Sequence, residues 1–103
     1  MAAEITGQRW IHSYEEDGAE GQVYRPDTWD FPLSRRPREA LELESDGRAR
    51  LFLPGEEDRP RQEQASWKDE NGIIVVRATS AGGRRPTALR IVESCADRLL
   101  VRR

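Results

Sequence analysis

The chain of 103 residues contains little of what small functional sites are usually built from. It has one cysteine, Cys95, and one histidine, His12, which excludes an internal disulfide and most zinc sites. A serine in a nucleophile elbow and a phosphate-binding glycine loop are also missing, so acyl and phosphoryl transfer have no support. No apolar run approaches the ~20 residues of a membrane helix, and Met1 is not followed by an apolar signal core. We therefore expect a soluble cytoplasmic protein without a cofactor.

Charge is abundant but balanced. Lysine and arginine total 17 and aspartate and glutamate total 19, which leaves a formal net charge of -2. No whole-molecule field therefore favours nucleic acid or an anionic membrane as a partner. Lys68 is the one lysine, and we interpret the surplus of arginine as a coding bias rather than an anion-binding feature. A chain of this length fits one domain over residues 1–103, with residues 1–6 and 102–103 frayed.

Alternation of apolar and polar residues predicts short strands, and helical periodicity is nearly absent. The clearest pattern spans residues 38–53, where Asp46-Gly47 separates two alternating runs. A pair of this kind is a strong signal for a hairpin whose type I′ turn needs positive φ at both residues. Four leucines would then face one core: Leu41, Leu43, Leu51 and Leu53.

A second hairpin is expected around Asn71-Gly72, with Ala65 and Trp67 on one face of its first strand. Its second strand begins with the β-branched residues 73–76, which favour a strand over a helix. Such a continuous apolar run is typical of a strand that is covered on both faces, or of one whose outer face meets another surface. Further strands are expected at residues 9–14, 22–25, 88–92 and 99–101.

Residues 26–37 interrupt this pattern with three prolines, and Trp29 and Phe31 lie among them. Because proline cannot donate to a sheet ladder, we expect a crossing segment or a lid rather than a central strand. Short strands in sequential hairpins, about eight in number, predict an all-β fold, an antiparallel up-and-down meander that closes into a small barrel. Strands of this length favour an interior that is mostly filled by side chains.

Gly7-Gln8-Arg9-Trp10 at the start of the first expected strand, followed by a meander of hairpins, resembles the opening of small lipocalin-like (calycin-like) β-barrels. In that superfamily, a glycine and a tryptophan near the first strand help to close the base of the barrel. The string from Trp10 through His12-Ser13 to Phe31-Pro32 is also similar to uncharacterised bacterial proteins of this general size. The resemblance implies a small barrel that binds a ligand or a partner, and it transfers no catalytic activity.

His12 and the acidic residues 15–17 are the most tempting constellation for a metal or for acid–base chemistry. One histidine with carboxylates in a flexible turn is a poor preformed site, because metal sites need several fixed ligands. We interpret His12 as a strand histidine beside Tyr14 or Trp10, next to a solvated acidic turn, and we expect no metal. Cys95 is interpreted as an ordinary turn cysteine.

Trp29 and Phe31 are the best functional lead, because they stand in a proline-rich segment without alternation. Either their rings plug one mouth of the barrel or they are presented to a partner. We favour the plug, since large exposed apolar patches are uncommon on soluble monomers. A ligand would enter beside Trp29, Phe31 and Tyr24, where Arg25 or Arg36 could orient a carboxylate.

These observations lead to one favoured function and two others. We expect a non-catalytic, lipocalin-like binding module for a small apolar ligand or a protein partner. The second hypothesis is an accessory subunit or a homodimer that pairs through its edge strands. The third is an enzyme that uses His12. Arg35, Arg36 and Arg38 beside the two rings could form a platform for nucleic acid, which the balanced charge and the acidic segments argue against.

Overall fold

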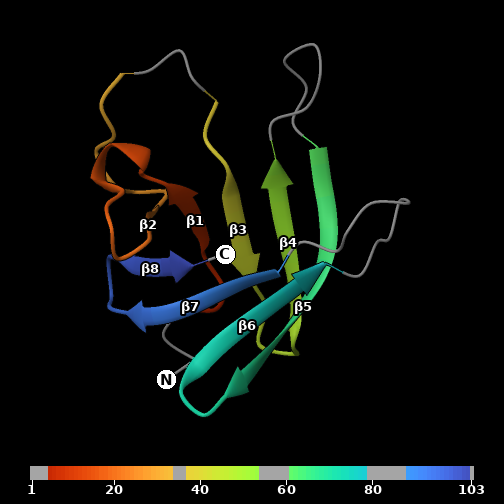
Figure 1. Ribbon diagram of the computed structural model, residues 1–103. Helices are drawn as coiled ribbons and strands as arrows, with labels where there is room; N and C mark the ends of the chain where they lie inside the picture. Colours follow the sequence, from red (N-terminus) through yellow and green to blue (C-terminus); the bar gives the residue numbers. More distant parts are fainter. Residues whose placement is uncertain (1–4, 34–36, 54–60, 79–87, 103) are drawn as a thin grey trace.

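The computed structural model describes residues 5–33, 37–53, 61–78 and 88–102 of the chain. Its elements are β1 (Arg9–His12), the 3-10 helix η2 (Tyr14–Glu16), β2 (Gln22–Pro26), β3 (Ala40–Leu43), β4 (Arg48–Leu53), β5 (Arg61–Glu70), β6 (Ile73–Ala78), β7 (Ala88–Ser94) and β8 (Leu99–Arg102). Figure 1 shows the strands wrapping around one another, and their hydrogen bonds close a barrel in the order β1-β2-β8-β7-β6-β5-β4-β3. The expected all-β class and antiparallel barrel of short strands are thus confirmed. No helix in these ranges is long and apolar enough to cross a membrane.

The strands from β3 to β8 form the meander, because each pairs with the next one along the chain. Leu41 lies opposite Leu51 and Leu43 lies opposite Ala49, and all four side chains are buried in the interior. The alternation therefore predicts this hairpin correctly. Leu53 is the exception, since it is half-buried at the end of β4 and does not belong to the interior cluster.

The turns at Asp46-Gly47 and Asn71-Gly72 have similar sequences but different backbone conformations. At Asn71-Gly72 the φ angles are 57° and 88°, the two positive values of a type I′ turn. At the other turn Gly47 has a φ of 92° but Asp46 has no positive φ, so the type I′ prediction is wrong there. The Glu44 N–H donates to the Arg48 carbonyl at 2.8 Å, which closes a loop that is one residue longer than a two-residue type I′ turn. Gly47 takes the left-handed position of this longer loop.

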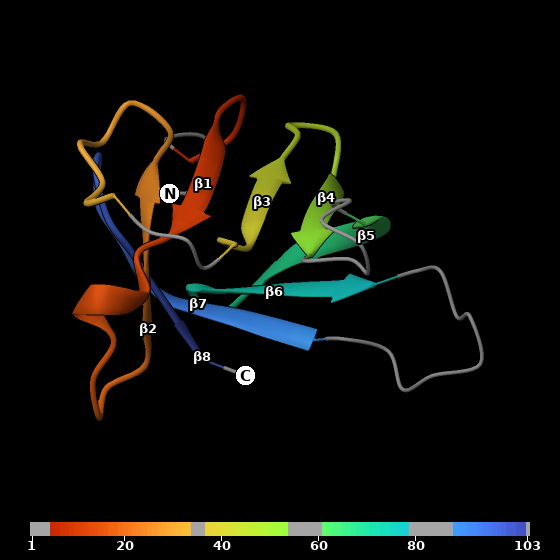
Figure 2. The same ribbon diagram turned by 90° about the horizontal axis from the view of Figure 1, so that it is seen from above.

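The first hairpin enters the barrel so that β1, and not β2, pairs with β3. β2 and β3 therefore run in the same direction on either side of β1, as Figure 2 shows from above. A chain joining two such strands must return along the barrel, which takes about a dozen residues or more. Residues 27–33 and 37–39, the described part of the chain between β2 and β3, are named here the crossover segment. The Asp27 N–H donates to the Arg9 carbonyl at 3.0 Å, and the His12 N–H donates to the Glu39 carbonyl at 2.7 Å. The described residues of the expected crossing segment lie between β2 and β3 and form no strand, except that Pro26 is the last residue of β2.

Apolar side chains from every strand fill the interior. The buried cluster consists of Ile5, Trp10, Tyr24, Leu41, Leu43, Ala49, Leu51, Ala65, Ile74, Val76, Leu89, Ile91, Leu99 and Val101. The indole N–H of Trp10 donates to the Ile5 carbonyl at 3.0 Å, which ties the residues before β1 to this cluster. Because Ile5 is fully buried and Arg102 is the last residue of β8, the expected fraying is wrong at these two positions. Residues 1–4 and 103 lie outside the described part of the chain.

Closure of the barrel also bears on how the molecule can bind a partner. Each described strand has a hydrogen-bonded neighbour on both sides. A module that adds its edge strand to another sheet needs a row of unpaired backbone groups. The edge-strand route of the second hypothesis therefore has no basis in the described strands.

Candidate functional site

Five side chains form an arginine–aromatic surface where η2, β2 and the crossover segment meet: Tyr14, Arg25, Trp29, Phe31 and Arg38. The guanidinium carbon of Arg25 lies 4.0 Å from the centre of the Trp29 ring. That of Arg38 lies 4.5 Å from the centre of the Tyr14 ring and 4.8 Å from that of Phe31. Cations over aromatic faces at these distances are attracted by the ring quadrupole. The surface therefore consists of two cation–aromatic stacks. Arg25 stacks on Trp29, and Arg38 lies over both Tyr14 and Phe31.

Two glutamates of η2 fix these arginines. Arg25 donates to Glu16 from Nε at 2.9 Å and from Nη2 at 2.7 Å. Arg38 donates to Glu15 from Nη1 at 2.8 Å and from Nη2 at 2.5 Å. These two-pronged hydrogen bonds lower the pKa of Glu15 and of Glu16 from 4.5 to about 2. The same bonds raise the pKa of Arg25 and of Arg38 above the ordinary value.

Each arginine also binds the backbone of a distant segment. Arg25 donates from Nη1 to the Asp97 carbonyl at 3.0 Å, which joins β2 to the turn between β7 and β8. Arg38 donates to the carbonyls of His12 and Pro32 at 3.0 and 3.2 Å, which joins β1 to the crossover segment. The donors of both arginines are thus largely occupied within the molecule. These hydrogen bonds tie the arginine–aromatic surface to β1, to the crossover segment and to the turn between β7 and β8.

His12 holds the connection between β1 and β2. Its Nε2 lies 3.0 and 2.8 Å from the two carboxylate oxygens of Asp17, and its ring stacks on Tyr24 with centres 5.0 Å apart. Asp17 also accepts the Val23 N–H at 3.0 Å. In the described ranges no group of three or more histidine, cysteine or acidic side chains is placed to hold a metal ion. Residues 15–17 are exposed, as expected of a solvated acidic turn, and each of them also pairs with a basic or imidazole side chain, which the sequence did not predict.

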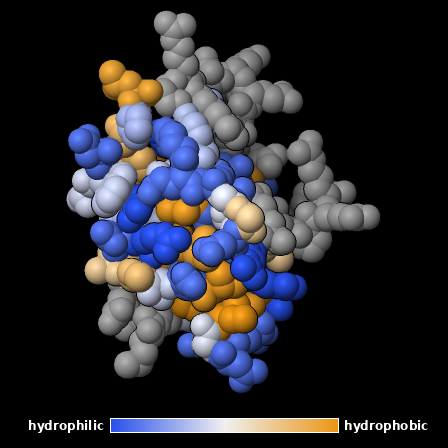
Figure 3. Space-filling view, turned by 60° about the vertical axis from the view of Figure 1, so that its left-hand side comes forward, coloured by the Kyte–Doolittle hydropathy of each residue, from blue (hydrophilic) through white to orange (hydrophobic). Residues whose placement is uncertain are grey.

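Trp29 and Leu33 are the large apolar side chains exposed in the described part of the crossover segment. Trp29 is 37% exposed and Leu33 is 105% exposed, whereas Phe31 is half-buried against Arg38. Trp29 lies against Arg25, which alternates with the inward-facing Tyr24 on β2 and so faces outward. The structure does not place Trp29 as a plug of the barrel mouth. Figure 3 brings this side of the molecule forward, and it is mostly hydrophilic.

The structure brings together some of the residues that the sequence nominates for ligand binding. Arg25, Trp29 and Phe31 lie on the arginine–aromatic surface. Tyr24 is 1% exposed and belongs to the interior, on the opposite face of β2. Arg36 lies outside the described residues. A ligand-binding role for these five residues stays a prediction.

Sequence reasoning missed Tyr14 and Leu33 as members of this region and did not pair Arg38 with Glu15. The two adjacent glutamates of η2 turn to arginines that are 9 and 23 residues away along the chain. No local spacing encodes such a pairing. The signal that was available is the alternation of Arg25 with Tyr24, which places the arginine on the outer face of its strand.

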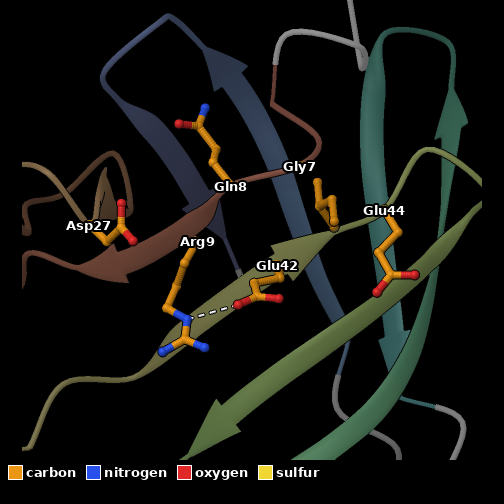
Figure 4. Close-up of a pocket in the computed structure, with 7 residues that line it drawn as sticks. Gly7, Gln8, Arg9, Asp27, Glu42 and Glu44 are labelled. Carbon is orange, nitrogen blue, oxygen red and sulfur yellow. Dashed lines mark hydrogen bonds and ion pairs between the residues drawn. The ribbon is translucent and has the colours of Figure 1, made fainter.

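A second feature is a polar pocket of about 480 Å³ on the outer face of β1 and β3, shown in Figure 4. It is lined by Gly7, Gln8, Arg9, Asp27, Glu42, Leu43 and Glu44. Arg9 donates from Nε to Glu42 at 2.8 Å, while Glu44 pairs with Arg50 at 3.2 Å. Two of its three acids are therefore already neutralised, and the pocket offers little apolar surface to the small apolar ligand that the sequence suggests.

Cys95 is exposed in the turn between β7 and β8, where its N–H donates to the Arg98 carbonyl at 2.8 Å. This confirms the expected turn position. An ordinary thiol needs a neighbouring cation or base to become reactive, and the Arg25 guanidinium is close enough to interact with Cys95 electrostatically.

Comparisons with protein family models, with curated proteins and with solved structures find no match for this chain. The closed antiparallel barrel agrees with the fold that the lipocalin-like resemblance implies. The family itself and the similarity to bacterial proteins gain no support from the comparisons.

Proposed function

We propose that this chain is a non-catalytic binding module that recognises a protein partner through Trp29 and Leu33. The observation that carries the proposal is the exposure of these two large apolar side chains on one short stretch, 37% and 105%. Tryptophan and arginine are among the residue types most enriched at the positions that dominate protein–protein binding. Exposed apolar groups that cluster on a soluble domain commonly mark an interaction surface.

The surroundings of Trp29 support this role by limiting the entropy that binding would cost. One face of its ring is covered by Arg25, which Glu16 and the Asp97 carbonyl hold in turn. The beginning of the crossover segment is fixed by the hydrogen bond from Asp27 to the Arg9 carbonyl. A side chain that is already ordered loses less freedom on binding, so more of the contact energy appears as affinity.

A protein fits these side chains better than a small apolar ligand does. Small molecules bind in concave pockets that cover most of their surface. Leu33 is fully exposed and therefore projects from the molecule, and an apolar side chain that projects needs a partner with a pocket of its own. The barrel interior, where a lipocalin-like ligand would bind, is occupied by the buried cluster. The lipocalin-like relationship and the cytoplasmic location stay predictions.

The proposal of a non-catalytic role has its own support. His12 is 6% exposed, and its Nε2 is directed to the carboxylate of Asp17. A general base must reach the proton that it removes from a substrate. A buried ring whose nitrogen is bound to a structural carboxylate is poorly suited to this task.

Selection from a random peptide library displayed on phage tests the proposal without a known partner. We expect peptides that bind the wild-type chain and lose roughly tenfold or more affinity for the Trp29→Ala and Leu33→Ser variants. Arg48→Ala is the control, because Arg48 is exposed on β4 and lies outside the crossover segment. Circular dichroism verifies that each variant is folded. Peptides that bind all four proteins equally, or an empty selection, would overturn the proposal.

A further inference from the structure

The outer face of β6 is apolar although it faces away from the barrel interior. Ile74 and Val76 belong to the interior cluster, so Ile73 and Val75 point outward. Ile73 is 39% exposed, while Val75 is 7% exposed. The lower part of the view in Figure 3 contains a group of apolar side chains surrounded by hydrophilic ones. The run of β-branched residues 73–76 thus serves both faces of its strand.

Val75 lies at the floor of an open groove of about 430 Å³. The groove is lined by Glu70, Ile73, Val75, Arg77, Ala88 and Arg90. Lys68 is the register partner of Val75 on β5, and Arg90 is its partner on β7. The long stems of these two basic side chains can cover Val75 while their charges stay in water.

The charges around the groove are unbalanced. Arg90 lies opposite Arg102 across β7 and β8, and like charges in this position repel each other. Arg102 donates to the Glu20 carbonyl at 2.7 Å, and it forms no ion pair with a carboxylate of the described residues. Neither Arg90 nor Lys68 forms an ion pair with any residue in the described ranges. Lys68 on β5, Arg90 on β7 and Arg102 on β8 therefore form a row of three exposed cations across the sheet, with Val75 of β6 between Lys68 and Arg90.

The acid at the groove does not offset this surplus. Glu70 stands at the end of β5 and lies 3.6 Å from Arg77, a pair in which both side chains are about half exposed. Its charge is thus matched by Arg77, and the row of Lys68, Arg90 and Arg102 keeps a net positive charge. An unpaired basic row beside an apolar floor is complementary to a ligand that carries several negative charges and an apolar group.

We propose that this groove binds an extended acidic peptide segment of a protein partner, with an apolar side chain over Ile73 and Val75. Neighbouring strands are about 4.8 Å apart, so the three cations are spread over roughly 15 Å or less. Acidic side chains spaced along an extended chain can meet such a row, whereas the single carboxylate of a fatty acid would meet one cation. The site is independent of the Trp29–Leu33 recognition proposed above.

A second copy of the chain is a poorer occupant of the groove. A two-fold interface brings the same patch of both subunits together. The basic row of one copy would then face the basic row of the other, with Glu70 already engaged by Arg77. Charge complementarity therefore favours a different, acidic partner.

Fluorescence anisotropy with a labelled pentapeptide of alternating glutamate and leucine, blocked at both ends, tests the proposal on the full chain. We expect saturable binding that weakens with salt and falls roughly tenfold or more in Arg90→Glu. This variant should fold, because it replaces a repelling pair with an attracting one opposite Arg102. Arg102→Glu and Ile73→Ser should weaken binding as well. Arg50→Glu on β4 makes the same charge change away from the groove and should leave binding unchanged.

Several outcomes would overturn the proposal. Equal losses in Arg90→Glu and Arg50→Glu would mean that net charge alone attracts the peptide. Undiminished binding of a peptide with serine in place of leucine would remove the role of the apolar floor. Tighter binding of decanoate than of the peptide, or dimers in sedimentation velocity that Arg90→Glu disperses, would identify a different occupant. Trp29→Ala should bind this peptide like the wild type, so the two binding proposals can fail separately.

Discussion

Trp10 and Trp29 place the same side chain in two opposite environments. Trp10 is fully buried in β1 and donates its indole N–H to the Ile5 carbonyl. Trp29 is 37% exposed, and the guanidinium of Arg25 covers one face of its ring. A strand sends every second side chain inward, which fixes the position of Trp10. No such alternation acts in the crossover segment, where ion pairs and cation–aromatic stacks hold the ring instead.

The comparison shows that two kinds of interaction stabilise this barrel, apolar packing in the interior and charged pairs on the surface. The interior depends on apolar volume and close packing, which respond strongly to a change of a single side chain. The arginine–aromatic surface depends on charged pairs, which respond to pH and salt and contribute less each. The two regions should therefore fail under different perturbations.

Trp10→Ala challenges the interior and should have the largest effect. Removing a buried tryptophan side chain loses its burial and leaves a cavity, which costs about 3–5 kcal/mol of the unfolding free energy. Since such a domain has only about 5–15 kcal/mol in total, the variant should be close to unfolding in denaturant titrations. Trp10→Phe keeps most of the apolar volume and should lose less. A smaller loss in Trp10→Ala than in Trp29→Ala would reverse the assignment of inside and outside.

Gly21 and Gly18 extend the comparison to the backbone. Gly21 has a φ of 144°, and a Cβ built on it would lie 2.7 Å from the Val101 carbonyl oxygen, where β2 meets β8. A Cβ built on Gly18 meets nothing within 4 Å. We expect Gly21→Ala to lower the unfolding free energy by roughly 1–3 kcal/mol and Gly18→Ala to change it by about 0.5 kcal/mol or less. Thermal unfolding of both variants measures the difference, and equal values would show that the β2–β8 seam does not require glycine.

Acid should act on the arginine–aromatic surface before it acts on the interior. The pKa of Glu15 and of Glu16 is about 2 in the folded chain and 4.5 without its partners, so the folded state holds these protons less tightly. Their stabilisation is present above pH 4.5 and is lost as the pH falls toward 2. Because both carboxylates are partly exposed, we expect an effect smaller than that of Gly21→Ala.

The double variant Glu15→Gln and Glu16→Gln isolates this contribution. It should be slightly less stable than the wild type at neutral pH and should show a flatter loss of stability between pH 4.5 and 2. Denaturant titrations at several pH values check this. Parallel curves for the two proteins would mean that the ion pairs add nothing to stability.

Most of the fold could be predicted because strand alternation is a local signal. Leu41, Leu43 and Leu51 lie where their spacing puts them, and Asn71-Gly72 makes the expected turn. The insertion of β1 between β2 and β3 could not be predicted, since it depends on which distant strands pair. The turn at Asp46-Gly47 failed because one dipeptide is compatible with loops of different length.

The candidate site was less predictable because its contacts join distant residues without a periodic pattern. The proline-rich stretch around Trp29 was recognised as exceptional, yet the stack on Arg25 and the pair with Glu16 depend on the crossover geometry. The apolar run at residues 73–76 did predict a strand whose outer face could meet another surface. Its basic neighbours come from β5, β7 and β8, so only the register of the barrel brings them together.

Trp29→Ala tests the outer side of the comparison and should have a small effect on stability. The variant loses a cation–aromatic contact that is worth about 0.5–1 kcal/mol at an exposed site, while Arg25 keeps its hydrogen bonds to Glu16 and to the Asp97 carbonyl. A double-mutant cycle of Trp29→Ala with Arg25→Met should give a coupling energy of the same size. A coupling of zero would mean that the stack does not stabilise the fold, and a loss of about 3 kcal/mol or more in Trp29→Ala alone would place the ring in the core. Because we expect the fold to survive without this ring, a loss of peptide binding in Trp29→Ala would report recognition rather than misfolding.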